Sequence, residues 1–126
     1  MPNLLTMQNE ELIHDWMISH LAHRLSRDYT DIKTNFRDDR RNEFKGRYPD
    51  LILANHGMVL AIMEVETDNT ITPEQADEWK LLAGLGAKLI IMAPKALRAK
   101  TLDLLWKKGI ADKASVGSYE LSVTMP

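Results

Sequence analysis

Two apolar runs in the middle of the chain constrain the fold most. Residues 51–54 and 58–65 are apolar at nearly every position, and Asn55, His56 and Gly57 separate them. Strands that are buried on both faces have this composition, whereas a strand with one solvated face alternates apolar and polar residues. A three-residue loop that ends in a left-handed glycine suits a hairpin between such strands. The centre of the chain therefore predicts a β-hairpin with helices covering both faces of its sheet.

The flanking segments carry the usual signals of helices and strands. Apolar residues at helical spacing indicate helices, and Thr72, Pro73 and Gln75 suit an N-cap, a first helical position and a capping box. The expected elements are a helix over roughly residues 8–26, a strand over 29–35, a loop over 36–47, the hairpin, a helix from Thr72 to Gly84 or Gly86, a strand over 87–93, a helix from Pro94 to Gly109 and a strand over 116–123. This order predicts an α/β fold with a mixed central β-sheet flanked by helices.

Length and composition favour a single domain over residues 1–126, since one domain usually takes roughly 100–200 residues. The chain has no cysteine, which excludes disulfides, zinc–thiolate sites and thiol catalysis. The absence of cysteine suits a cytoplasmic protein, which we expect here. We expect no membrane contact, because no apolar run approaches the ~20 residues that span a bilayer. The net charge is −2, so any nucleic-acid contact needs a local basic patch.

Three acidic residues lie near the ends of the expected hairpin. With a three-residue loop, Asp50 faces Ile62 across the hairpin, and Glu64 is a diagonal neighbour of Asp50 on the same face. Glu66 follows on that face, because side chains along a strand alternate with a period of two. The sequence therefore predicts that Asp50, Glu64 and Glu66 gather at one end of the sheet.

Such a cluster is suited to a divalent cation. Carboxylates that are buried together repel one another and need solvent, a partner or an ion. Mg²⁺ or Mn²⁺ is the natural partner, since hard cations take oxygen ligands and often use only one or two protein carboxylates. The alternative is that these are ordinary solvated acids at strand ends.

These residues resemble the signature of the PD-(D/E)XK nuclease superfamily. Pro49 and Asp50 are followed fourteen positions after Asp50 by Glu64, Val65 and Glu66, and the order of elements over roughly residues 8–93 is similar to the αβββαβ restriction-endonuclease-like core. The resemblance implies that Asp50 and Glu64 are metal ligands and that the Val65 carbonyl is a further ligand. Glu66 stands where the superfamily usually has a lysine that positions or activates the attacking water.

The helix after the hairpin adds to the resemblance. Gln75 and Trp79 are similar to the QxxxY motif of the RecB-like exonuclease branch, with Trp in place of Tyr, which implies that Gln75 contacts DNA or shapes the site. Lys80 is a candidate for a displaced catalytic lysine. The alternatives are a capping-box role for Gln75, a core position for Trp79 and a solvated surface position for Lys80.

The superfamily often places a glutamate of the first helix near the metal. Glu10 and Glu11 compete for this role, and Glu10 falls nearer the apolar side of the helix. We therefore expect Glu10 to be a metal ligand. His14 lies one turn further on and could also approach the site.

A basic cluster precedes the acidic motif and could clamp a phosphate backbone that enters the site. The alternative is a solvated loop balanced by its neighbouring acids. The cluster consists of Arg37, Arg40, Arg41, Lys45 and Arg47.

Two functions follow from these features. The first is a nuclease that depends on Mg²⁺ or Mn²⁺ and hydrolyses DNA, working as a homodimer or within a larger complex because so small a domain covers little nucleic acid. The second is a non-catalytic, degenerate nuclease fold that binds nucleic acid or a protein.

Overall fold

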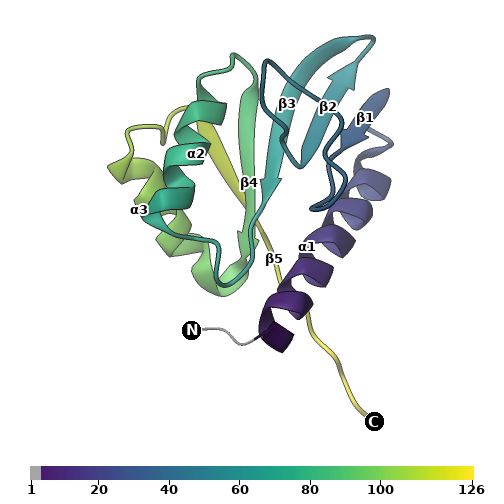
Figure 1. Ribbon diagram of the computed structural model, residues 1–126, viewed down its shortest axis with the longest axis vertical. Coiled ribbons are helices and arrows are strands. Elements are labelled where there is room, and N and C mark those ends of the chain that lie inside the picture. The colour runs from purple at the N-terminus through teal and green to yellow at the C-terminus, as the bar shows by residue number, and fades with distance from the viewer. Residues whose placement is uncertain (1–3) are drawn as a thin grey trace.

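The chain forms a five-stranded mixed sheet with three α-helices (Figure 1). The structure is a computed structural model that describes the backbone of residues 4–126 and the side chains of residues 9–126. The elements in chain order are α1 (Leu4–Leu25), β1 (Asp31–Thr34), β2 (Leu51–Asn55), β3 (Met58–Val65), α2 (Pro73–Ala83), β4 (Lys88–Pro94), a 3₁₀ turn (Lys95–Leu97), α3 (Arg98–Lys107) and β5 (Ala114–Tyr119). The predicted order of helices and strands is confirmed, although β5 ends four residues earlier than expected.

The sheet joins an antiparallel half to a parallel half. Its strands lie in the order β1-β2-β3-β4-β5, with β1, β2 and β3 antiparallel and β4 and β5 parallel to β3. The antiparallel half follows from the hairpin, and the parallel half follows from the crossovers through α2 and α3. As a result, β2 begins at the edge of the sheet where β3, β4 and β5 end.

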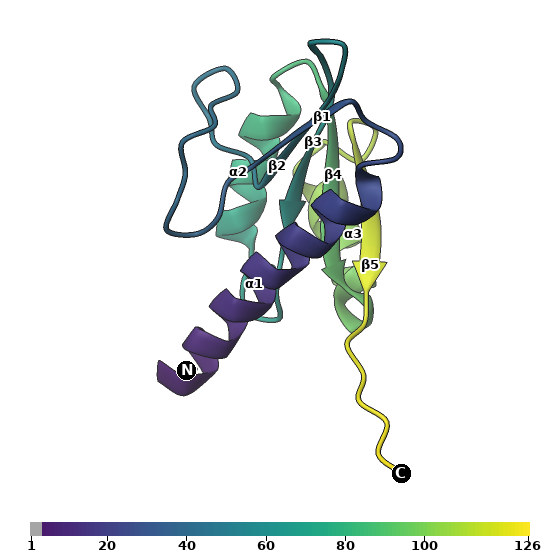
Figure 2. The ribbon, with the colours of Figure 1, turned by 90° about the vertical axis from the view of Figure 1, so that its right-hand side faces the viewer.

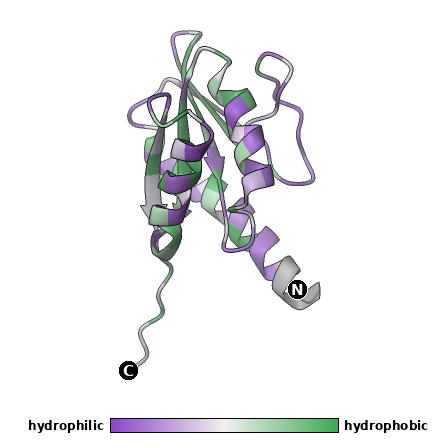
Figure 3. Ribbon diagram, turned by 90° about the vertical axis from the view of Figure 1, so that its left-hand side faces the viewer, coloured by the Kyte–Doolittle hydropathy of each residue, from purple (hydrophilic) through white to green (hydrophobic). Residues whose placement is uncertain are grey.

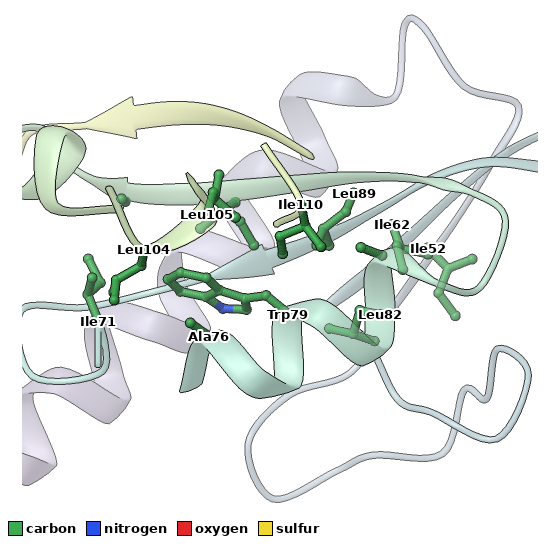
Figure 4. Close-up of a cluster of buried hydrophobic side chains, with 13 residues drawn as sticks. Ile52, Ile62, Ile71, Ala76, Trp79, Leu82, Leu89, Leu104, Leu105 and Ile110 are labelled. Atoms are coloured by element: carbon green, nitrogen blue, oxygen red, sulfur yellow. The ribbon is translucent and has the colours of Figure 1, made fainter. Parts of the chain in front are cut away.

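Helices cover both faces of the sheet, as the double-sided burial of the central strands predicts (Figure 2). On one face, Met17, Ile18 and Leu21 of α1 pack against a cluster that includes Leu51 and Met63. On the other face, α2 and α3 enclose a second cluster, in which the fully buried Trp79 packs among aliphatic side chains of the sheet and of α3 (Figure 4). The central strands β2, β3 and β4 are mostly hydrophobic, whereas the helices mix hydrophobic and hydrophilic residues (Figure 3).

The hairpin register differs from the prediction. The loop contains only His56 and Gly57, with φ angles of 50° and 82°, so Asn55 pairs with Met58. Two central residues with positive φ make the tight turn whose twist matches that of the flanking strands. The expectation that Asp50 faces Ile62 is wrong, because Ile62 pairs with Ile52.

A β-bulge accounts for the rest of the difference. Ala54 pairs with Val59 but Leu53 pairs with Ala61, which leaves Leu60 as the extra residue of β3. The pairing continues to Leu51 and Met63, so its next step places Asp50 across from Glu64. Asp50 is therefore a direct neighbour of Glu64 rather than a diagonal one.

Helix α2 begins as predicted. Thr72 is its N-cap, and the hydroxyl of Thr72 accepts a hydrogen bond from the backbone N–H of Gln75 at 3.1 Å. The helix is followed by Gly84 as its C-cap. Within residues 4–126, no helix is long and apolar enough to cross a membrane.

Candidate functional site

Asp50, Glu64 and Glu66 lie together at the edge where β2 begins and β3 ends. All three are buried, and they line one cavity of about 500 Å³. The loop before β2, helix α1 and helix α2 supply the other walls. The further lining residues are His14, Arg37, Arg40, Gly46, Arg47, Tyr48, Val65, Thr70, Gln75 and Glu78. The predicted gathering of the three carboxyl groups is therefore observed in this structure.

Asp50 is held as a carboxylate although it is only 2% exposed. Its Oδ2 accepts hydrogen bonds from the Val65 N–H at 2.8 Å and from His14 Nε2 at 3.1 Å. Burial acts to raise the pKa of Asp50, but hydrogen bonds from His14, Glu64 and Val65 and the charge of His14 outweigh it and lower the pKa. The lowered pKa therefore favours the charged form of Asp50.

Glu64 has the opposite character, although it touches Asp50. Burial and the negative charge of Asp50 hold the pKa of Glu64 well above its usual range, and the two carboxyl groups are hydrogen-bonded to each other. The raised pKa favours the protonated form of Glu64, which can donate a hydrogen bond to the Asp50 carboxylate, since two adjacent carboxylates do not both ionise readily. Among the side chains of residues 9–126, no N–H donor is directed at Glu64. We call these two residues the Asp50–Glu64 pair.

Glu66 is fixed by two neutral donors from α2. Its Oε1 accepts hydrogen bonds from Gln75 Nε2 at 3.0 Å and from Trp79 Nε1 at 2.9 Å. Burial raises the pKa of Glu66, and hydrogen bonds from Thr70, Trp79 and Gln75 oppose that shift. We call Glu66, Gln75 and Trp79 the Glu66 corner. Gln75 consequently does not close a capping box as the sequence suggested, and Trp79 is both a core residue and a donor.

Val65 connects β3 to the Asp50–Glu64 pair. Its neighbour Glu66 donates its N–H to the carbonyl of Met92 in β4, whereas the Val65 N–H points the other way, to Asp50. The N–H and the C=O of one strand residue point to the same side of the strand. The Val65 carbonyl therefore faces the side on which Asp50 lies, as the resemblance implies for a ligand.

These residues fit a divalent cation, but with fewer carboxylates than predicted. Across the side chains of residues 9–126, no three His, Asp or Glu residues are placed to hold one ion together. Asp50, Glu64 and the Val65 carbonyl provide an oxygen set of the kind Mg²⁺ uses, which often includes only one or two carboxylates. We place Glu66 outside that set because its Oε1 already accepts hydrogen bonds from Gln75 and Trp79.

His14, rather than Glu10, is the residue of α1 that reaches the cavity. His14 lies between Asp15, at 2.9 Å from Nδ1, and Asp50. Burial acts to lower the pKa of His14, but the hydrogen bonds and charges of Asp50 and Asp15 raise it. The carboxylate of Glu10 instead accepts two hydrogen bonds from Asn69, at 3.0 and 2.9 Å, and does not line the cavity. The expectation of a Glu10 ligand therefore has no support in this geometry.

Three of the five predicted phosphate-binding residues line the cavity. Arg37 pairs with Glu11 at 3.1 Å, Arg40 Nη2 lies 3.5 Å from Asp50 Oδ1, and Arg47 donates to both oxygens of Glu78 at 3.2 Å. These guanidinium groups form a partly exposed rim above the buried acids, which we call the arginine rim.

The other predicted basic residues are placed elsewhere. Arg41 pairs with its neighbour Asp39 on the surface. Lys45 donates to the Leu85 carbonyl at 2.6 Å and so ties the loop to the end of α2. Lys80 is exposed and does not line the cavity, so the structure does not bring the candidate displaced lysine to the site.

Tyr48 is a cavity residue that the sequence reasoning missed. It lines the cavity, it is 43% exposed, and its carbonyl accepts a hydrogen bond from Arg40 Nη1 at 2.9 Å. The available signal was its position, because an aromatic residue lies between the basic cluster and Asp50 in the sequence.

Comparison with protein-family models, with curated proteins and with solved structures gives no match for this chain. The residues of the cavity are therefore the basis for assigning a function.

Proposed function

We propose that this protein is a divalent-metal-dependent nuclease that hydrolyses phosphodiester bonds in DNA. The Asp50–Glu64 pair carries the proposal, because two buried carboxyl groups lie side by side in one cavity that is also lined by three arginines. The order of elements supports a PD-(D/E)XK-type αβββαβ core. We also propose that the domain acts as a homodimer or within a larger complex, since it alone covers little nucleic acid.

The roles of the residues follow from their contacts. Asp50, Glu64 and the Val65 carbonyl would hold Mg²⁺ or Mn²⁺. Such an ion can activate water and stabilise the charge that develops on the phosphoryl group. His14 and the Val65 N–H fix the orientation of the Asp50 carboxylate, as outer-shell partners do in metal sites.

The arginine rim would bind the phosphate backbone. Arg37, Arg40 and Arg47 each present a guanidinium group at the cavity, and guanidinium groups match phosphate oxygens in charge and geometry. Their present acidic partners on α1, at Asp50 and on α2 keep the rim from being a free positive patch. A bound phosphate would exchange with those partners.

One observation favours a second candidate function. No lysine is among the residues that line the cavity, and Glu66, which stands at the lysine position, is held by Gln75 and Trp79. This arrangement also suits a degenerate nuclease fold that binds nucleic acid or a protein without cleaving it.

A cleavage assay separates the two functions. Wild-type protein is incubated with DNA and Mg²⁺ or Mn²⁺, beside the variants Asp50→Asn and Glu64→Gln and the control Glu74→Gln, which changes an exposed acid in the first turn of α2. The nuclease proposal expects cleavage by wild type and control that EDTA and both site variants abolish. DNA binding without cleavage under any condition supports the second function. Cleavage that persists in Asp50→Asn would show that another site is responsible.

A further inference from the structure

We infer that the cavity takes single-stranded DNA, or the unpaired end of a strand, with one base stacked on Tyr48. This inference rests on the proposed function, because it names the substrate class of the same site. It depends on three observations: the depth of the acids, the composition of the rim, and the place of Tyr48.

The acids are almost fully buried, which disfavours their contact with an intact duplex. Asp50 is 2% exposed and Glu64 is 8% exposed, at the base of a cavity of about 500 Å³. Duplex DNA is stiff, with a persistence length of about 50 nm, and deforming it costs free energy. A single strand bends freely at each nucleotide. The recess therefore favours a flexible strand that can place one phosphate beside the Asp50–Glu64 pair.

The rim combines the two features that sequence-independent single-strand binders use. Those proteins pair a positively charged groove with aromatic side chains on which bases stack. Here Arg37, Arg40 and Arg47 supply guanidinium groups that can exchange their present acidic partners for phosphates, and Tyr48 is an exposed aromatic residue that lines the same cavity. In a duplex the bases are already stacked on each other, so an aromatic surface at the rim stabilises the binding of an unpaired strand only.

The position of Tyr48 is fixed relative to the acids. Only Pro49 separates it from Asp50, and its carbonyl is bound by Arg40, whose Nη2 also approaches Asp50. A base on Tyr48 would therefore belong to a nucleotide close to the phosphate at the acids.

A second exposed aromatic side chain, far from this cavity in the sequence, provides a control. Trp106 is 75% exposed on α3 and does not line this cavity. If any exposed ring attracted DNA non-specifically, Trp106 would serve as well as Tyr48. The inference requires that it does not.

The test is binding of a fluorescent oligonucleotide to the full chain, followed by anisotropy. The same strand is used alone and annealed to its complement, in a buffer with Ca²⁺, a hard cation that screens the carboxylates. We expect the single strand to bind more tightly than the duplex. Tyr48→Ala should weaken single-strand binding by about 5- to 150-fold, the effect of removing one stacked base. Tyr48→Phe keeps the aromatic ring and should retain the single-strand preference. Trp106→Ala should bind as wild type does.

The outcomes separate this inference from the proposed function. Equal or tighter binding of the duplex, or full single-strand binding by Tyr48→Ala, would overturn the inference. Metal-dependent cleavage of a duplex that is lost in Asp50→Asn would then leave the nuclease proposal standing. Conversely, single-strand binding that needs Tyr48, without cleavage, would support the inference as a binding property and remove the nuclease activity.

Discussion

The Glu66 corner and the Asp50–Glu64 pair are neighbouring parts of one cavity, yet the carboxyl groups of Glu66 and Glu64 have different kinds of partner. Glu66 accepts hydrogen bonds from two neutral donors on α2, and one of these donors is the most deeply buried aromatic residue of the core. Glu64 instead lies against another carboxyl group, and burial and the charge of Asp50 raise the pKa of Glu64. Both regions are buried, so burial alone does not distinguish them.

The difference indicates which acid stabilises the fold and which acid is available to a ligand. A buried carboxylate with matched donors is part of the structure, because removing a donor leaves an unsatisfied buried group. A pair of carboxyl groups without N–H donors on Glu64 is strained electrostatically, and a cation relieves the strain by replacing the shared proton. The sequence alone does not distinguish the three acids, whereas their hydrogen-bond donors in the structure do.

The largest effect is expected for Trp79 in the Glu66 corner. Trp79→Ala should lower the free energy of unfolding by about 3–5 kcal/mol, because it leaves a cavity in the core and removes a donor to Glu66. Trp79→Phe keeps a ring but lacks the indole N–H, and should cost about 1–3 kcal/mol. Urea unfolding followed by circular dichroism measures both. A loss below 1 kcal/mol for both variants would show that the corner is not structural.

Glu64→Gln should weaken metal binding without lowering stability, the reverse of the effect expected for the Trp79 variants. The amide is similar in shape to the protonated Glu64 and can donate to Asp50, so we expect no loss in the free energy of unfolding. Mn²⁺ affinity should fall by more than about 100-fold, since even the loss of outer-shell partners costs 10- to 100-fold. Calorimetric titration with Mn²⁺ measures this, with the exposed Glu74→Gln as the matched control. A Glu64→Gln protein that is destabilised but binds Mn²⁺ normally would reverse our assignment of the two regions.

The pH dependence of stability should identify the proton of Glu64. Above the ordinary value of 4.5, the unfolded chain has lost this proton while the folded chain retains it, because the folded pKa is raised. The folded state then binds more protons, so the free energy of unfolding falls as the pH rises towards the folded pKa. Glu66 contributes with the same sign in wild type and in Glu64→Gln, so the difference between their Tm–pH curves isolates Glu64.

We expect a shallower decline in Glu64→Gln than in wild type. Mn²⁺ at neutral pH should raise the Tm of wild type alone, because the ion takes the place of the proton. Parallel curves for the two proteins would mean that Glu64 titrates normally in the folded state.

The smallest effects are expected for the arginines, and they should distinguish Arg47 of the arginine rim from Arg41 on the surface. Arg41 forms an exposed pair with Asp39, and such pairs contribute about 0–1 kcal/mol, so Arg41→Ala should hardly alter stability or DNA binding. Arg47→Ala should weaken DNA binding and lower the slope of log affinity against log salt by about one, the effect of one lost phosphate contact. Equal salt slopes for the two variants would remove Arg47 from the arginine rim.

The order of elements could be predicted from sequence because each boundary has a local signal. The double-sided apolar runs indicated buried strands, and Thr72 indicated the start of α2. The bulge had no such signal, because Leu60 is one apolar residue among several in β3. The effect of the bulge on the register depends on how β2 and β3 pair, which no local sequence signal specifies.

The gathering of the acids was nevertheless predictable, for a reason that the register makes clear. The shorter loop and the bulge each move the pairing by one residue, and together they move it by two. A shift of one would have turned the side chains to the opposite face, whereas a shift of two keeps the face and changes only the neighbour. Asp50 therefore meets Glu64 directly, on the face that was expected.

The partners of the acids were much less predictable. Which residue of α1 reaches Asp50 depends on how far the helix slides along the sheet, so Glu10 and His14 were difficult to rank from the sequence. The role of Gln75 depends on a contact nine residues back along the chain, at Glu66. Tyr48 was missed because its exposure depends on the path of the loop.

The most direct test of the central claim is a crystal structure of the protein grown with Mn²⁺, with the ion located by its anomalous scattering. Our account predicts one strong peak between Asp50 and Glu64, at about 2.1 Å from a carboxylate oxygen of each, with the Val65 carbonyl adjacent and Glu66 still bound to Gln75 and Trp79. A peak at Glu66 instead, or no peak between Asp50 and Glu64 at saturating Mn²⁺, would contradict it.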